Sequence, residues 1–322
     1  MKTIHTREQK QESEKRALVI RQGSLGDICL TGPVFAAFRS AGYQVTVAGR
    51  REYCEVLRQI GLIADILPLD RPPLADLFCE ASAATPGGAP LSADTIHLLT
   101  SFDTIVSYTE REEPFTRNLL RSSHRNIIIH PVSAEDITCH ISDELLKPVR
   151  ALLPGPSPAI RQATQTGRAT STVVLHPGSG SPAKNWPIEN FLHLFQHLIN
   201  TRKTSVLLGP AEEDQYAFWS ERIPKDSLFV SDSLADTRSL LDQTGCFIGN
   251  DSGVTHLAAL MGVTTVALFG PTSPALWAPR GPHVTILYHP VACSPCSRDR
   301  RNRCTDRKCL TGITPVEIQK SE

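Results

Sequence analysis

The chain has 322 residues, a length typical of two domains of ordinary size, each large enough to bury an apolar core. Its 33 lysines and arginines balance its 33 aspartates and glutamates. The overall charge therefore gives no attraction to nucleic acid or to an anionic membrane surface, and any anion must be held by a local arrangement of groups.

The first 16 residues are rich in charged and amide side chains and contain no apolar segment. They match neither a signal peptide nor a membrane anchor, so we expect a disordered tail over residues 1–16. No uninterrupted apolar run elsewhere approaches the roughly 18 residues of a membrane span. We therefore expect a soluble, cytoplasmic protein.

The first strand is expected at 17–20 and leads into a loop that contains Gly23, Gly26 and Asp27, followed by a helix over 28–39. The two glycines lack the third glycine of the dinucleotide fingerprint, which argues against a dehydrogenase. Asp27 follows the carboxyl end of the strand, where open α/β sheets bind their ligands. A helix cap is the alternative role for this carboxylate.

Further strands of the first half are expected at 44–48, 63–67, 104–108 and 126–129, with a helix over 51–60 and a loop with at most one short helix over 72–90. These elements predict one α/β domain over residues 17–155. Residues 156–171 are poor in large apolar side chains and form the expected linker. The second domain is then 172–322.

The second half opens like the first, with a strand at 172–175 and a loop that contains Gly178, Ser179, Gly180 and Lys184. The glycines let the backbone approach a ligand, and Lys184 adds a positive charge. A helix over 188–200 and a strand over 205–208 follow. One of the three acidic residues after that strand, Glu212, Glu213 or Asp214, could hold ribose hydroxyls, whereas a solvated carboxylate at a helix start is the alternative for any one of them.

The segment after Cys246 predicts a strand, a helix that begins near Gly253 and ends at Gly262, and a buried strand over 264–269. The helix start, with Asp251 or Ser252 as its N-cap, suits a phosphate group. Asp251 would repel an anion, so we assign it to capping or to sugar hydroxyls. His256 could reach back to the ligand, or could simply be packed in the core.

Two groups of cysteines are present among the nine of the chain. Five are isolated in apolar surroundings and are expected to be buried free thiols of a reducing compartment: Cys29, Cys54, Cys79, Cys139 and Cys246. The other four lie within 17 residues and could bind a structural zinc ion: Cys293, Cys296, Cys304 and Cys309.

Five motifs in order resemble glycosyltransferase family 9, the ADP-heptose:lipopolysaccharide heptosyltransferases. They are residues 21–27, 176–187, 208–213, 250–274 and the closing cysteine segment. The resemblance implies a GT-B fold, in which two Rossmann-like domains with parallel sheets face a central cleft. The N-terminal domain would bind a lipid-linked oligosaccharide acceptor of the lipopolysaccharide core, and the C-terminal domain ADP-heptose. Such an acceptor allows peripheral contact with the cytoplasmic face of the inner membrane.

The resemblance also implies roles for individual residues. Lys184 matches the phosphate-binding lysine, Glu212 the ribose or adenosine contact, and Asp27 the base of an inverting transfer that requires no metal. The donor-binding segment of the family matches Asp251, Ser252, Gly253 and His256, with serine at a position where threonine is frequent. No acceptor motif is matched between Pro72 and Arg125.

Two other functions remain as alternatives. A nucleotide-sugar epimerase of similar build would need further acid and base groups deep in the cleft, and the sequence shows no such set. A nucleic-acid-binding protein with a zinc module would use the basic run 298–303, but the balanced charge and the aromatic content of 6% argue against it.

Overall fold

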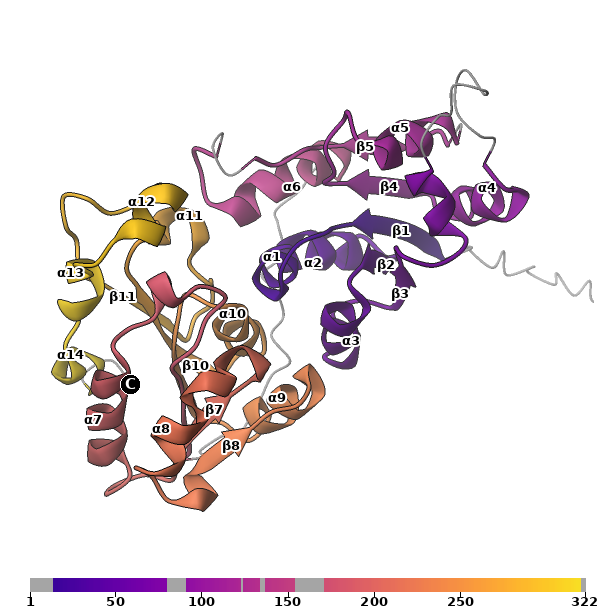
Figure 1. The fold of residues 1–322 in the computed structure, drawn as a ribbon. Coiled ribbons are helices and arrows are strands. Elements are labelled where there is room, and N and C mark those ends of the chain that lie inside the picture. Colours follow the sequence, from indigo (N-terminus) through magenta and orange to yellow (C-terminus); the bar gives the residue numbers. More distant parts are fainter. Residues whose placement is uncertain (1–13, 80–90, 123, 134–136, 154–170, 320–322) are drawn as a thin grey trace, which may run out of the picture.

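The computed structural model describes residues 14–79, 91–122, 124–133, 137–153 and 171–319, and these form two parallel β-sheets (Figure 1). The first half of the chain forms a five-stranded sheet of order β3-β2-β1-β4-β5. The second forms a six-stranded sheet of order β11-β10-β9-β6-β7-β8. In both sheets the first strand of the half lies inside the sheet, so the loop that follows it opens at the sheet's central carboxyl edge.

The elements of the first half alternate between strands and helices, as a parallel sheet requires. They are β1 (Lys15–Ile20), α1 (Leu25–Leu30), α2 (Gly32–Ser40), β2 (Tyr43–Gly49), α3 (Arg51–Gln59), β3 (Asp65–Pro68), η1 (Leu74–Phe78), α4 (Ala93–Thr100), β4 (Thr104–Ser107), α5 (Pro114–Arg121), β5 (Ile127–Ile129) and α6 (Ile141–Leu152). The short helix expected within 72–90 is η1. The rest of that stretch, 80–90, lies outside the described residues.

Two expectations for the first half need correction. Lys15 and Arg16, placed in the tail, already pair with Tyr43 and Gln44 of β2, so the sheet begins two residues earlier. Residues 1–13 lie outside the described part of the chain. The helix expected from residue 28 begins earlier, at Leu25, so Gly26 and Asp27 lie in α1 and not in the preceding loop. The regular part from Gly32 is a separate helix, α2, with Pro33 in its first turn.

The second half repeats the alternation and then adds a closing segment. Its elements are β6 (Val173–His176), η2 (Pro182–Lys184), α7 (Ile188–Leu198), β7 (Thr204–Leu208), η3 (Pro210–Gln215), α8 (Tyr216–Ser220), η4 (Lys225–Ser227), β8 (Leu228–Val230), α9 (Leu234–Leu241), β9 (Cys246–Asn250), α10 (Gly253–Leu260), β10 (Thr264–Phe269), α11 (Pro274–Trp277), β11 (Val284–Tyr288), α12 (Arg298–Arg303), α13 (Lys308–Thr311) and α14 (Pro315–Gln319). The expected linker, 156–171, lies almost wholly outside the described residues.

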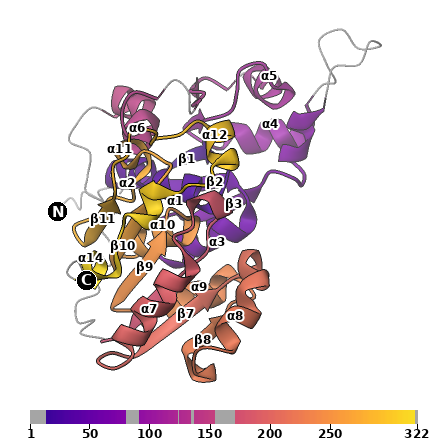
Figure 2. The ribbon, with the colours of Figure 1, turned by 60° about the vertical axis from the view of Figure 1, so that its left-hand side comes forward.

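The two halves meet where α1 packs against α10 (Figures 1 and 2). Each helix has a glycine at the contact. A Cβ at Gly253 would come within 2.8 Å of the Leu25 Cβ, and one at Gly26 within 3.3 Å of the His256 ring. The glycines therefore let the starts of the two helices, one from each sheet, approach closely.

A second contact between the halves involves the start of α6. His140 caps this helix, because its Nδ1 accepts a hydrogen bond from Ser142 N–H at 3.2 Å, and its Nε2 lies 2.8 Å from the carbonyl oxygen of Ala278. Arg280 forms an ion pair with Asp143 at 2.8 Å. Burial lowers the pKa of His140, which favours the neutral ring that donates from Nε2 and accepts at Nδ1.

Only three of the five isolated cysteines are buried. Cys29, Cys54 and Cys246 are buried as expected, and burial raises the pKa of the Cys54 thiol to about 12, so this thiol stays protonated. The expectation is wrong for the other two. Cys79 is exposed at the end of η1, and Cys139 is half-buried before α6, with its sulfur 3.5 Å from Glu144.

Within the described residues, none of the helices combines the length and the apolar character that crossing a bilayer requires.

Candidate active site

A cavity of about 720 Å³ lies between the two halves. The first half contributes the start of α1, and the second contributes the loop before η2, the start of α10 and the segments after β10 and β11. Of the residues singled out from the sequence, the cavity is lined by Gly26, Asp27, Gly180, Lys184, Asp251, Ser252, Gly253 and His256. Gly23, Gly178, Ser179 and Glu212 do not line it. The structure thus brings the expected base and most of the expected donor-binding residues to one cavity.

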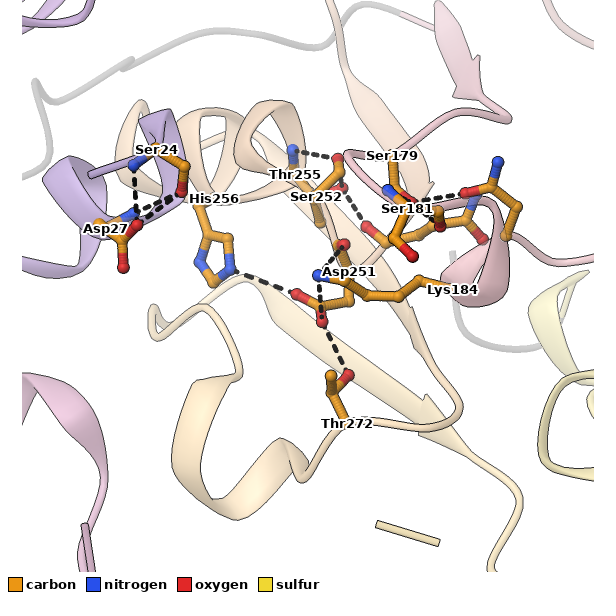
Figure 3. Close-up of polar contacts among 12 residues, drawn as sticks. Ser24, Asp27, Ser179, Ser181, Lys184, Asp251, Ser252, Thr255, His256 and Thr272 are labelled. Atoms are coloured by element: carbon orange, nitrogen blue, oxygen red, sulfur yellow. Dashed lines mark hydrogen bonds and ion pairs between the residues drawn. The ribbon is translucent and has the colours of Figure 1, made fainter. Parts of the chain in front are cut away.

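Asp251 is the centre of a polar network in this cavity (Figure 3). Its Oδ2 lies 3.0 Å from Lys184 Nζ and accepts a hydrogen bond from the Thr272 hydroxyl at 2.7 Å. Its Oδ1 lies 3.7 Å from His256 Nε2, which is an ion-pair distance and too long for a hydrogen bond. Burial alone would raise the pKa of Asp251, but His256, Lys184 and Thr272 outweigh it, and the pKa lies far below its ordinary value. Asp251 is therefore a carboxylate that fixes Lys184.

Ser252, and not Asp251, caps α10. Its hydroxyl oxygen accepts a hydrogen bond from Thr255 N–H at 3.3 Å, and the Thr255 hydroxyl in turn donates to the Asn250 carbonyl at 2.6 Å. The carboxylate of Asp251 is consequently free of the helix start. The first turn of α10 begins at the cavity wall, where its positive dipole end suits an anion.

Asn250 is a residue that the sequence reasoning missed. It is completely buried at the end of β9. Its Oδ1 accepts from Trp186 N–H at 2.8 Å, and its Nδ2 donates to the Pro177 carbonyl at 2.8 Å. The side chain thereby ties the end of β9 to both ends of the loop that carries Lys184. The signal available in the sequence was an amide side chain at the end of an apolar strand, directly before Asp251.

The loop that holds Lys184 is shaped by Ser179. The Ser179 hydroxyl lies 2.6 Å from Asn185 Oδ1 and 2.8 Å from the Ser181 carbonyl oxygen. This hydroxyl is occupied within the loop, and Gly180 and Lys184 are the loop residues that line the cavity. Its expected contact with the donor phosphate stays a prediction.

Glu212 is buried, so the solvated carboxylate weighed as its alternative is wrong. Its Oε2 accepts from Gly209 N–H at 2.9 Å, at the start of η3. A Cβ at Gly178 would overlap the Glu212 carboxylate, which explains the need for glycine there. Glu212 thus packs against Gly178 in the loop before Lys184. Its proposed contact with ribose stays a prediction.

Asp27 has the capping role that the sequence offered as one of two alternatives, and it also lines the cavity, where its role as a base stays a prediction. Its Oδ2 accepts from the Ser24 N–H at 2.8 Å and from the Ser24 hydroxyl at 2.7 Å, and so completes a capping box at the start of α1. Its Oδ1 has a longer contact, 3.4 Å from Arg21 Nη2. Gly23 has a φ of +129° and a Cβ there would lie 2.7 Å from Asp27 Oδ2, so this position requires glycine.

Arg21, which received no role from the sequence, lies beneath Asp27. Its side chain is only 10% exposed, and its Nε is buried without a hydrogen-bond partner in the described part of the chain. The guanidinium lies 5.9 Å from the Tyr108 ring centroid. Burial lowers the pKa of Arg21, whereas the Asp27 carboxylate raises it. Arg21 therefore depends on Asp27 for its charge compensation.

A second cavity, of about 610 Å³, lies on the other side of the loop after β1. Gln22 and Gly23 line it, together with residues that follow β2 and β3. The charged residues among these are Arg50, Arg51, Glu52, Asp70 and Arg71. Three arginines at neighbouring strand ends suit an anionic ligand. The adjacent arginines after the second strand, Arg50 and Arg51, were the signal in the sequence for this cavity.

The four clustered cysteines gather beside the cavity without a metal-site geometry. Among the residues that the structure describes, no three His, Cys, Asp or Glu side chains are placed to hold a metal ion. The thiols are nevertheless near neighbours: burial raises the pKa of Cys309 to about 11, with smaller contributions from Cys296, Cys293 and Cys304. The present arrangement of Cys293, Cys296, Cys304 and Cys309 thus does not fit the expected zinc, and the metal stays a prediction.

Residues 155–305 match the sequence model of glycosyltransferase family 9 (heptosyltransferase). The second half of the chain is thus similar to glycosyltransferase family 9. A comparison with curated protein sequences gives no match.

Solved structures of family 9 enzymes share the fold along the whole chain. A family 9 glycosyltransferase from Veillonella parvula DSM 2008 matches with a TM-score of 0.73 and 18% identity, over 96% of each chain. The E. coli ADP-heptose lipopolysaccharide heptosyltransferase II matches with a TM-score of 0.67 and 14% identity, over 95% of this chain and 97% of that one. E. coli heptosyltransferase WaaC with ADP matches with a TM-score of 0.60 and 15% identity, over 95% of this chain and 98% of that one. The fold is thus the GT-B arrangement, and together with the match of the second half to family 9 it supports glycosyltransferase activity.

Proposed function

We propose that this protein is a family 9 enzyme, and that it transfers heptose from ADP-heptose to a hydroxyl of a lipopolysaccharide-core or related glycan acceptor, with inversion and without a metal ion. One observation carries the proposal. A single cavity holds Asp27 from the first half, and Lys184, Asp251, His256 and the start of α10 from the second. The related E. coli WaaC has been solved with ADP and with ADP-2-deoxy-2-fluoro heptose, which supports this choice of donor.

The donor diphosphate would lie at the start of α10, beside Lys184. Two features favour this position: the positive end of the helix dipole and the ammonium group on the facing loop. Asp251 would not touch the diphosphate. It holds Lys184 at 3.0 Å and so reduces the conformational freedom that the lysine must lose when the donor binds. Lys184 would supply the charge compensation that a metal ion gives in other enzymes.

The acceptor hydroxyl would be activated by Asp27. Because Ser24 occupies Oδ2, Oδ1 is the oxygen that would take the proton. The acceptor oxygen then forms a bond to the anomeric carbon of the donor, while the bond from that carbon to the diphosphate oxygen breaks and its electron pair leaves with ADP. Attack from the face opposite ADP inverts the anomeric configuration.

The acceptor would extend from Asp27 into the second cavity. The loop after β1 borders both cavities, since Asp27 lines the first and Gly23 lines the second. Arg50, Arg51 and Arg71 would there hold carboxylate or phosphate groups of the acceptor. An acceptor that carries an acidic sugar or a phosphate fits this arrangement.

The proposal is tested by measuring ADP release from ADP-heptose with and without lipopolysaccharide-core oligosaccharide, each in the presence and absence of EDTA. We expect release that requires the acceptor and continues in EDTA. Conversion of the donor to another sugar without acceptor would instead indicate an epimerase. Loss of transfer in EDTA, restored by a divalent cation, would contradict the metal-independent mechanism.

A further inference from the structure

The closing cysteine segment forms one wall of the donor cavity. Pro295, Cys296, Ser297 and Arg301 line it together with Lys184. Arg301 lies on α12, is half-buried, and has a buried Nε without a hydrogen-bond partner among the described residues. An arginine held at a cavity wall with a buried, unpaired donor is costly unless a ligand completes its hydrogen bonds.

Hydrogen bonds to backbone carbonyls tie this segment to the two loops that form the donor site. The N–H of Cys296 donates to the carbonyl of Pro271 at 2.8 Å, and the Ser294 hydroxyl donates to the carbonyl of Gly270 at 2.5 Å. Further along, Arg307 Nη1 donates to the carbonyl of Pro182 at 2.8 Å, at the start of the turn that carries Lys184. The segment therefore belongs to the donor side of the cavity.

The cavity needs a further positive charge to balance a bound diphosphate. Lys184 is already paired with Asp251 at 3.0 Å, and Asp27 adds a second carboxylate. Among the described lining residues, Arg301 is the other permanently charged cation. A guanidinium also matches phosphate oxygens with two parallel N–H donors, which an ammonium group cannot do.

We propose that Arg301 binds the diphosphate of the nucleotide-sugar donor. This inference rests on the proposed function and adds to it a residue from outside the donor motifs. When the bond between the anomeric carbon and the diphosphate oxygen breaks, negative charge grows on that oxygen, and Arg301 stabilises it. The cysteine segment thus positions a cation in the donor site.

The test compares ADP and adenosine binding by isothermal titration calorimetry. Arg301→Gln should weaken ADP binding by about 10- to 100-fold, the range of a charge-assisted hydrogen bond, and leave adenosine binding unchanged. Arg301→Lys should lose less ADP affinity than Arg301→Gln. The matched control is Arg303→Gln, an exposed arginine of the same helix that does not line the cavity, and it should bind ADP like the unmodified protein.

Three results would contradict the inference, and they are distinguishable. Unchanged ADP affinity in Arg301→Gln, while the unmodified protein binds ADP, would overturn the role of Arg301 alone. Equal losses for ADP and adenosine would show that Arg301 acts on the structure of the site and does not bind the diphosphate. No ADP binding by the unmodified protein or by Arg303→Gln would overturn the proposed donor as well. Should Arg301→Gln fail to fold, the ratio of ADP to adenosine affinity in Arg301→Lys decides.

Discussion

Replacement of Asp27 by asparagine separates its two roles. The amide oxygen of asparagine can still accept the hydrogen bonds that Ser24 donates to Oδ2, so the capping box is largely kept. The amide cannot take a proton from the acceptor. We therefore expect turnover to fall by roughly 10²–10⁴, the usual contribution of a general base, while ADP affinity changes little. Thermal unfolding should show a modest loss of stability, because Arg21 loses the carboxylate at 3.4 Å.

Ser24→Ala is the matched control for Asp27→Asn. It removes the side-chain cap of α1, which costs about 1 kcal/mol of stability, but leaves the carboxylate of Asp27 in place. We expect its turnover to stay within a few-fold of the unmodified protein. The assay is single-turnover transfer from ADP-heptose, with ADP affinity measured in parallel. Normal turnover in Asp27→Asn, or an equal loss in Ser24→Ala, would refute Asp27 as the base.

The remaining predictions concern the donor lysine, the contact between the halves and the cysteines. Lys184→Ala should weaken ADP binding by about 10- to 100-fold in calorimetry, whereas Lys225→Ala, at a residue that does not line the cavity, should not. Equal affinities in the two variants would contradict the assignment of Lys184 to the phosphate site. Burial lowers the folded-state pKa of His140, so its contribution to stability is present above the unfolded value of about 6.5 and is lost as the pH falls below that value. Urea unfolding between about pH 8 and pH 5 should show this loss of stability. His140→Gln should make the loss smaller. The zinc hypothesis predicts bound metal in elemental analysis of protein purified without added metal, and the absence of both zinc and iron would rule it out.

The sequence predicts best the elements whose signals are local. The unit of β9, α10 and β10 was placed correctly, because apolar strands flank a helix that a hydroxyl residue caps and a glycine follows. The positions of Asp27 and Lys184 shortly after β1 and β6 were also predicted, although Asp27 lies in the first turn of α1 and Lys184 in η2. Residues 17–20 of β1 are completely buried, as the run of apolar side chains indicated.

Pairings between distant residues could not be predicted in this way. Lys184 and Asp251 are 67 positions apart, and only the fold brings them together, so Asp251 was assigned to capping or to sugar hydroxyls. A solvated carboxylate at a helix start was the alternative weighed for Glu212, whereas the loop of Gly178 covers it. The role of Arg301 depends on how the closing segment folds back over the cavity, which no local pattern encodes.

The anomeric configuration of the product tests the central claim most directly. Proton NMR of the glycan formed from ADP-heptose by the unmodified protein reports whether the new bond has the configuration of the donor or the opposite one. Asp251 is paired with Lys184, so Asp27 is the carboxylate of the cavity that would act as base, and direct attack then predicts the opposite configuration from the first turnover onward. Retention of the donor's configuration would contradict direct attack by an acceptor hydroxyl activated by Asp27.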